Sequence, residues 1–178
     1  MGFIVGETIC SVPLAFSSGY TIRDEISLPA TPPTRIPRAA LWLGLTGTIP
    51  FFAGNVALIF PTLWPDLTMV ADQAVKTYGA VVLSFLGGIR WGLGMRKDRE
   101  ERSRTLAMSV VPALFGWFAL FLPDASAVLV LAGGVACQGF WDIKTATADG
   151  APPWYSRLRI ILTILVCLLL ALFWLYSA

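Results

Sequence analysis

The chain has 178 residues, of which 56% are hydrophobic and only 13% are charged, and its mean hydropathy is +0.72. Soluble domains carry about a quarter charged residues, so this composition excludes a soluble enzyme and indicates a membrane protein. The sequence contains no histidine, which removes the commonest ligand of haem, zinc and copper, and we therefore expect no redox metal site and no cofactor.

The segment before residue 39 is predicted to be an extended or peripheral tail. Residues 3–16 are mildly apolar, but an acidic residue interrupts them and no basic segment precedes them. This stretch is too short to span a bilayer and is a poor signal peptide. Residues 31–37 are rich in proline and predict an extended approach to the membrane, where Arg35 and Arg38 could lie among lipid phosphates.

Residues 39–178 are predicted to form one all-α membrane domain. A helix needs roughly 20 apolar residues to cross a bilayer, and five such stretches follow one another with short connections. The predicted spans are residues 39–64, 74–95, 105–122, 125–143 and 158–176. The sequence therefore predicts a polytopic bundle of five transmembrane helices, the first of them kinked by Pro50.

Basic residues gather on alternate connections between the predicted spans. Three lie before the first span, five between the second and third, and three around the connection to the fifth, which leaves only two of the 13 Lys and Arg residues elsewhere. The opposite connections hold Asp66, Asp72 and Asp124 and no Lys or Arg. Because basic residues near span ends are retained inside, the N-terminus is predicted to be cytoplasmic and the C-terminus periplasmic.

Small residues recur at every fourth position of the second predicted span. They are Ala80, Ser84, Gly88 and Gly92. Membrane helices associate by close backbone approach along such ridges. The ridge could form an interface with a partner or a second copy, but packing against another helix of the same chain is the more common arrangement in multispan proteins.

Arg90 lies about five residues before the inner end of its predicted span, which is roughly 7–8 Å deep at 1.5 Å per residue. At that depth an arginine costs up to about 3 kcal/mol unless it is paired or reaches the interface. Gln138, Asp142 and Tyr155 are predicted to lie at a similar depth. The cluster could be an ion pair that sets helix register, or a site for an anionic or polar headgroup.

No catalytic constellation is predicted. No serine has a plausible base, and no paired carboxylates lie within a predicted span. Cys10, Cys137 and Cys167 are far apart and form no CxxC motif, so neither a redox pair nor a zinc site is predicted. We therefore expect that the protein is not an enzyme.

Three stretches carry a resemblance to a known family. They are RIP at 35–37, YGAVVLSFLGGIRWG at 78–92 and PWYSRLR at 153–159. In these stretches the chain resembles a family of uncharacterised five-span membrane proteins that occurs in proteobacteria and, as the transmembrane protein 69 type, in mitochondria. The resemblance runs from Arg35 to the C-terminus. It implies a multi-pass protein of the bacterial cell inner membrane, or of its mitochondrial counterpart, and it implies no activity.

Two functions of different classes remain open. The leading hypothesis is a non-catalytic accessory or assembly component of a larger energy-transducing membrane complex. Its expected partners are membrane lipids and either other inner-membrane subunits or a second copy of the chain. No nucleic-acid partner is expected. The alternative is a binder or carrier of a small lipophilic ligand (a quinone, a lipid or a tetrapyrrole) through the cluster around Arg90. A third possibility, a membrane enzyme acting on lipid, lacks an evident general base.

Overall fold

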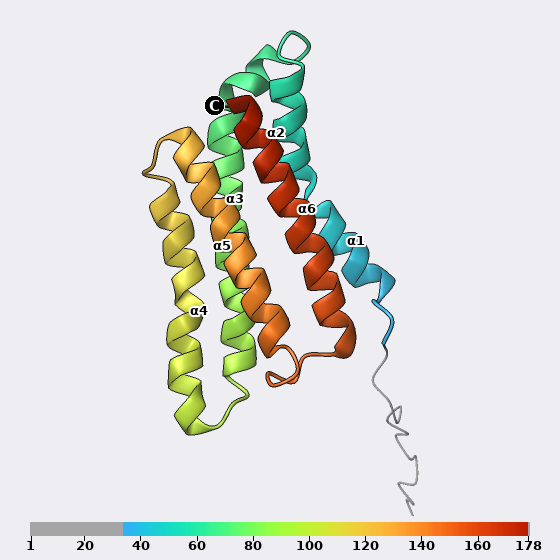
Figure 1. Ribbon diagram of the computed structural model, residues 1–178, viewed down its shortest axis with the longest axis vertical. Helices are drawn as coiled ribbons and strands as arrows, with labels where there is room; N and C mark the ends of the chain where they lie inside the picture. The colour runs from blue at the N-terminus through green and yellow to red at the C-terminus, as the bar shows by residue number, and fades with distance from the viewer. Residues whose placement is uncertain (1–33, 178) are drawn as a thin grey trace, which may run out of the picture. The chain divides into compact units, whose positions relative to one another are not determined.

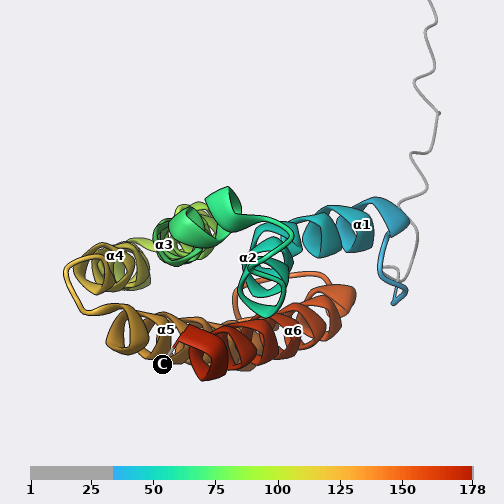
Figure 2. The same cartoon turned by 90° about the horizontal axis from the view of Figure 1, so that it is seen from above.

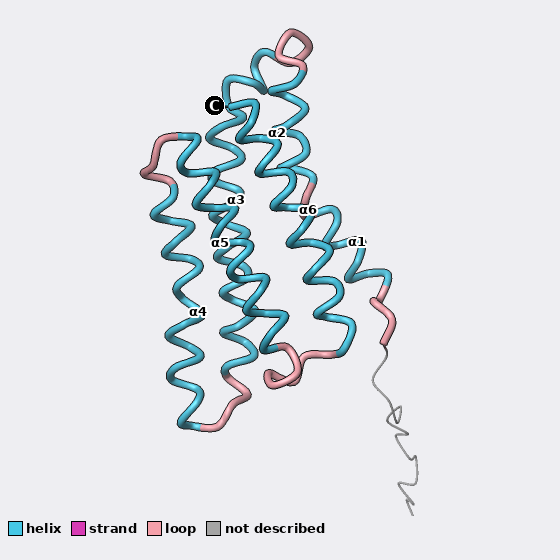
Figure 3. Tube along the Cα trace, in the orientation of Figure 1, coloured by secondary structure: helices cyan, strands magenta, loops and turns pink. Residues whose placement is uncertain are grey.

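The computed structural model describes residues 34–177, which are helical with short loops and contain no strand (Figures 1 and 3). Its helices are α1 (Arg38–Thr46), α2 (Ile49–Ile59), α3 (Pro65–Gly94), α4 (Arg99–Ala119), α5 (Asp124–Thr145) and α6 (Pro153–Ser177). The predicted all-α fold is confirmed. Most of the predicted N-terminal tail, residues 1–33, lies outside the described residues.

The first predicted span is divided into two helices. Pro50 lies in the first turn of α2, where its missing N–H costs no hydrogen bond, whereas its ring would clash with the carbonyl of Thr46 in a continuous helix. The hydroxyl of Thr48 donates to the Leu45 carbonyl at 2.7 Å and satisfies one of the carbonyls at the end of α1. The predicted bend at Pro50 is therefore present, but the second part ends at Ile59 instead of near residue 64.

Three helices extend beyond the predicted spans at their N-terminal ends. α3 begins at Pro65 and α6 at Pro153, because proline is tolerated at the first position of a helix. α4 begins at Arg99, with Glu100 and Glu101 in its first turn. The positive end of the helix dipole stabilises acidic side chains at this position. The predicted spans start too late because they were defined by apolar residues only, whereas these helices begin in polar sequence.

The outward surface of the bundle is largely apolar. Phe85, Leu168 and Phe140 are each more than 60% exposed, and many other large hydrophobic side chains are exposed as well. Soluble monomers rarely expose so much contiguous apolar surface, so the fold suits a lipid environment. Among residues 34–177, three segments could cross a membrane by length and composition: Arg38–Ile59, Asp124–Thr145 and Pro153–Ser177. The five crossings and their orientation stay predictions.

Within the described residues, the helices lie in two rows. Figure 2 shows α4, α3 and α1 in one row and α5 and α6 in the other, with α2 between α3 and α6. The buried core lies between the rows, where Leu83 of α3 and Leu131 of α5 are fully buried together with Phe51, Leu170 and Phe173. α3 packs against α2, α4 and α5, and α6 packs against α1, α2 and α5.

α3 and α4 pack closely through residues seven positions apart on α3. A Cβ atom at Gly87 would overlap the backbone carbonyl oxygen of Ser109. A Cβ at Gly94 would lie 2.9 Å from Thr105, and one at Gly116 of α4 would lie 2.9 Å from the Cα of Ala80. Only small residues fit at these positions, so Ala80, Gly87 and Gly94 bring the two helix backbones together.

Candidate functional site

A buried polar network joins α3, α5 and α6 at one end of the bundle. This end carries the α3–α4 loop (residues 95–98) and the α5–α6 loop (residues 146–152), and we call it the basic end (Figure 1). Asp142 of α5 lies at the centre of the network, with its side chain 2% exposed. Its Oδ1 accepts hydrogen bonds from Nη1 of Arg90 at 3.1 Å and from Nε2 of Gln138 at 2.8 Å. Its Oδ2 accepts from Nε of Arg159 at 2.9 Å.

Arg90 has further partners around the same carboxylate. Its Nη1 donates to the Thr145 hydroxyl at 3.0 Å, and its Nη2 lies 3.7 Å from Oδ2 of Asp149. The guanidinium also lies 5.1 Å from the centre of the Trp141 ring, which is a cation–π distance. These contacts come from α5 and from the loop that follows it, and they explain how an arginine 5% exposed is stabilised.

Asp149 extends the network into the α5–α6 loop. Lys97 Nζ lies 2.8 Å from its Oδ1 and also pairs with Glu101. Burial acts to raise the pKa of Asp149, but hydrogen bonds from Lys97 and Thr145 outweigh it and hold the pKa below its ordinary value. The hydrogen bond to Asp149 raises the pKa of Lys97. Both groups are therefore charged at neutral pH, and the loop is tied to the end of α3.

The structure brings together most of the predicted polar cluster. Arg90 and Gln138 both donate hydrogen bonds to Asp142, so these three side chains lie together. Tyr155 lies on α6 near them, but its buried hydroxyl has no hydrogen-bond partner in the described chain. Sequence reasoning left Arg159 out of the cluster, although it lies one helical turn after Tyr155 and so shares its face.

Asp149 was also missed, because its role depends on how the α5–α6 loop folds back. Gly150, which follows it, adopts a positive φ of 70°, a conformation that glycine reaches without steric cost. The Ala151 N–H donates to the Ala146 carbonyl at 2.9 Å across this turn. The turn returns Asp149 to the end of the bundle, and nothing in the residue spacing indicates that contact.

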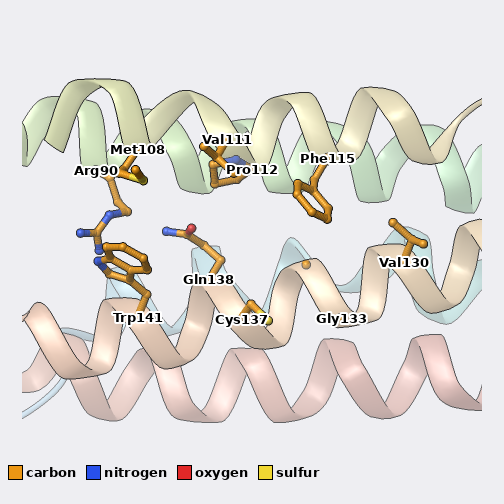
Figure 4. A pocket seen from close by; sticks show the side chains of 11 residues that line it. Arg90, Met108, Val111, Pro112, Phe115, Val130, Gly133, Cys137, Gln138 and Trp141 are labelled. Atoms are coloured by element: carbon orange, nitrogen blue, oxygen red, sulfur yellow. The ribbon is translucent and has the colours of Figure 1, made fainter. Parts of the chain in front are cut away.

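A cavity of about 460 Å³ adjoins the network on the side of α4. Figure 4 shows Arg90, Gln138 and Trp141 at one end of this cavity and Phe115 and Val130 toward the other. Apart from the polar end, its lining is apolar and is completed by Met108, Val111, Pro112, Gly133, Gly134 and Cys137. We call it the α4–α5 cavity. Two of the four residues predicted for ligand binding, Arg90 and Gln138, line it.

The small residues at every fourth position of α3 (Ala80, Ser84, Gly88 and Gly92), which we call the α3 ridge, are divided between two environments. Ala80 packs against Gly116 of α4, in line with the intramolecular alternative. Ser84 is exposed, and a Cβ atom at Gly88 or Gly92 would meet no atom within 4 Å. The outer three residues of the ridge therefore face away from the described helices, beside Phe85, which is 67% exposed.

Within residues 34–177, no group of three or more acidic or cysteine side chains is placed to hold a metal ion. In the same part of the chain Cys137 is an exposed free thiol and Cys167 a half-buried one. The guanidinium and amide groups around Asp142 offer hydrogen bonding and charge recognition.

Comparison with known proteins gives a family and no activity. A protein-family model described as "Protein of unknown function (DUF3429)" matches residues 36–175. The chain is 37% identical to Transmembrane protein 69 of Xenopus tropicalis over 135 residues, which are 72% of this chain and 50% of that protein. It is 31% identical to Transmembrane protein 69 of Mus musculus over 134 residues, 72% of this chain and 52% of that protein.

The chain thus spans about half the length of the curated relatives it matches. No solved structure is significantly similar to it. The resemblance to the transmembrane protein 69 type is confirmed by the family match and by both relatives. The names of the relatives and the apolar helices agree on the class of protein. The chain is therefore a membrane protein, and it belongs to the DUF3429 family of proteins of unknown function.

Proposed function

We propose that this chain is a non-catalytic membrane protein that binds a small lipophilic molecule in the α4–α5 cavity. The observation that carries the proposal is the cavity itself, which has apolar walls and a polar end formed by Arg90 and Gln138. Its volume of about 460 Å³ lies within the range of about 300–1,000 Å³ found for ligand pockets. A molecule with an apolar body and one polar group, such as a quinone, a lipid or a tetrapyrrole, matches this lining.

The polar end is rigid before any ligand arrives. Arg90 is held by Asp142, Thr145 and Trp141, and Gln138 is held by Asp142. Groups that are already positioned lose little conformational freedom on binding, which favours affinity. The same contacts make Arg90 part of the folded core, so Arg90→Leu would disrupt the network as well as the site. A test of binding therefore needs a variant elsewhere in the cavity.

Gly133 is the best position for that variant. It lines the cavity, and a Cβ atom placed there would meet no atom of the described chain within 4 Å. Gly133→Phe should therefore fill part of the cavity, and it should not weaken α5, because glycine is a poor helix former. Gly88→Phe is a matched control: it makes the same change at a glycine of α3 that also faces open space but does not line this cavity.

The experiment is to purify wild type, Gly133→Phe and Gly88→Phe from native membranes in mild detergent and to measure bound lipophilic molecules by mass spectrometry. We expect a near-stoichiometric molecule in wild type and in Gly88→Phe, and its loss in Gly133→Phe. The same molecule should slow maleimide labelling of Cys137, which lines the cavity. Equal recovery from all three proteins, or no stoichiometric molecule in wild type, would contradict the proposal.

A second candidate is an accessory component of a larger membrane complex, and the exposed part of the α3 ridge favours it. Ser84, Gly88 and Gly92 present little side chain, so the helix of another membrane protein could approach closely there. Gly133→Phe and Gly88→Phe also test this candidate, with their roles exchanged: Gly88→Phe is now the disruptive variant and Gly133→Phe the control. If it is correct, a partner recovered with wild type is lost in Gly88→Phe and kept in Gly133→Phe. Recovery of no stoichiometric partner with wild type would argue against it.

A further inference from the structure

A second cavity, of about 270 Å³, lies on the other side of the network, between the α1–α2 junction, α3 and α6. Its walls are largely apolar and include Phe51, Val82, Leu162 and Val166, and among the described residues Arg159 is the only charged one that lines it. We call it the α1–α6 cavity. It shares no lining residue with the α4–α5 cavity, so an occupant of one is not an occupant of the other.

The break before Pro50 explains how this cavity forms. α1 is connected to α2 by a bend and packs mainly on α6, where a Cβ atom at Gly44 would lie 2.7 Å from Leu162. The Tyr78 hydroxyl donates to the Gly47 carbonyl at 2.7 Å and connects the bend to α3. Leu43, which is 74% exposed, and Phe85 also line the cavity, so it opens to the outside of the bundle between α1 and α3.

Arg159 is buried without a full set of partners. It is 7% exposed, and Nε is the only one of its nitrogens that donates a hydrogen bond to the described chain, to Asp142. Nη2 is fully buried and has no acceptor there. The hydroxyl of Tyr155, one turn earlier on α6, is also buried without a partner. A buried donor without an acceptor costs about 1–3 kcal/mol, and more when it is charged. A ligand that supplied an acceptor here would therefore stabilise the protein.

The charge balance around Arg159 indicates the sign of that acceptor. Asp142 is the carboxylate that contacts Arg159, and it also contacts Arg90. Asp149 is shared between Arg90 and Lys97. Arg90 therefore has a second carboxylate in Asp149, and Lys97 has a second one in Glu101, whereas in the described chain Arg159 has only its share of Asp142. An anion beside Arg159 would give it a counter-charge of its own, which a buried cation needs.

We propose that the α1–α6 cavity binds an anionic amphiphile, with its carboxylate or phosphate on Arg159 and the first part of its acyl chain along Phe51, Leu162 and Val166. A guanidinium presents a planar pair of donors that matches either oxyanion, and the apolar walls match an acyl chain. Arg159 lies six residues into α6, or roughly 9 Å along the helix, which is near the expected depth of a lipid headgroup. The remaining chain would extend through the opening between α1 and α3.

The test uses the purified full chain in detergent, titrated separately with oleate, dioleoylphosphatidate and dioleoylphosphatidylcholine and followed by native mass spectrometry. We expect the wild type to prefer at least one acidic amphiphile over phosphatidylcholine by about tenfold or more. Binding of oleate alone would identify a free carboxylate as the ligand group, and binding of phosphatidate alone would identify a phosphate; binding of both supports the shared chemistry. Equal binding of all three would overturn the proposal.

Matched variants locate the binding. Arg159→Gln should abolish the preference, whereas Arg157→Gln, which removes an exposed charge of the same helix, should keep it. Val82→Phe narrows the cavity without touching a charge, and it should also abolish the preference, which keeps the test decisive if Arg159→Gln does not fold. A preference unchanged in Val82→Phe would place the amphiphile elsewhere and overturn the proposal. Gly133→Phe should have no effect, because the α4–α5 cavity is separate, so the two binding proposals can fail independently.

Discussion

Asp142 shows how one buried carboxylate can organise a helical bundle. Its two oxygens accept from side chains of three helices: Arg90 of α3, Gln138 of its own helix and Arg159 of α6. Each arginine alone would be costly inside a membrane, and together they need the charge of the same carboxylate. The residue therefore couples the packing of α3, α5 and α6, and it also stands between the two cavities that Arg90 and Arg159 line.

We predict that Asp142→Asn lowers the free energy of unfolding by about 3 kcal/mol or more, because removing one partner of a buried pair leaves an uncompensated charge. Glu101→Gln is a comparable change at the ion pair with Lys97, where the two side chains are 73% and 21% exposed, so the loss of that pair should cost less. Unfolding of both variants by denaturing detergent measures the difference. Equal losses would show that the buried network has no special role in stability.

The pair between Lys97 and Asp149 predicts a dependence of stability on pH. The pKa of Asp149 is lowered on folding, so its stabilising contribution is present above the ordinary aspartate pKa of about 4 and is lost as the pH falls through the lower pKa of the folded protein. The pKa of Lys97 is raised, so the lysine stays charged throughout that range. Asp149→Asn should therefore reduce the melting temperature at pH 7, and its difference from wild type should shrink below about pH 4.

Melting temperatures measured in detergent from pH 7 to pH 3 check this prediction. Glu101→Gln is the control, because it removes an exposed carboxylate that pairs with the same Lys97, and exposed pairs contribute little. A difference between Asp149→Asn and wild type that stays constant with pH would mean that the ionisation of Asp149 is not what stabilises the loop.

At the scale of a single element, α3 presents two kinds of small-residue face. Ala80, Gly87 and Gly94 lie against α4, where their size allows the backbones to approach. Ser84, Gly88 and Gly92 face away from the described helices. Both sets follow spacings that keep residues on one side of a helix. The spacing of small residues alone therefore does not tell which face packs within the chain.

The neighbouring residues Gly87 and Gly88 allow a matched test of these two faces. A Cβ atom at Gly87 would overlap the Ser109 backbone, which cannot move like a flexible side chain, whereas one at Gly88 meets open space. Gly87→Ala should destabilise the protein by about 1–3 kcal/mol. Gly88→Ala should leave stability unchanged or raise it by up to about 1 kcal/mol, because alanine favours the helix. Equal effects in detergent unfolding would contradict the assignment of the two faces.

At the scale of the whole described region, ion pairs connect α3 and α5 near both ends. Lys76 pairs with Asp124 at the start of α5, and Arg90 pairs with Asp142 near its end. A buried charge that is displaced along the bundle loses its partner and is left uncompensated. The two pairs thus help to define the relative position of α3 and α5 along the bundle.

The five-crossing arrangement predicts which loops reach each side of the membrane. In a background without native cysteines, Thr62→Cys in the α2–α3 loop should react with a membrane-impermeant maleimide added to intact bacterial cells that express the chain. Asp98→Cys in the α3–α4 loop should react only after the membrane is permeabilised, because the basic loops are expected inside. Labelling of both, or the reverse pattern, would refute the predicted orientation.

The sequence by itself determined the class of fold and the common level of three polar residues along the bundle. Long apolar stretches can satisfy their backbone hydrogen bonds inside a membrane only as helices or closed barrels, and their length and composition identified the helices. Counting residues from the span ends placed Arg90, Gln138 and Asp142 at one level, because the rise per residue of a helix is constant. The level of a residue along a helix axis can be read from a sequence, because it depends only on the position of that residue within one helix.

Only the tertiary structure decided which faces meet. It placed Arg159 against Asp142, returned Asp149 to Arg90 and Lys97, and buried Gly87 while leaving Gly88 open. These outcomes depend on the rotation of each helix about its axis and on the path of a loop, and both are set by contacts between residues far apart in the chain. The two cavities arise in the same way, because a space between helices is a property of several elements together and of none alone.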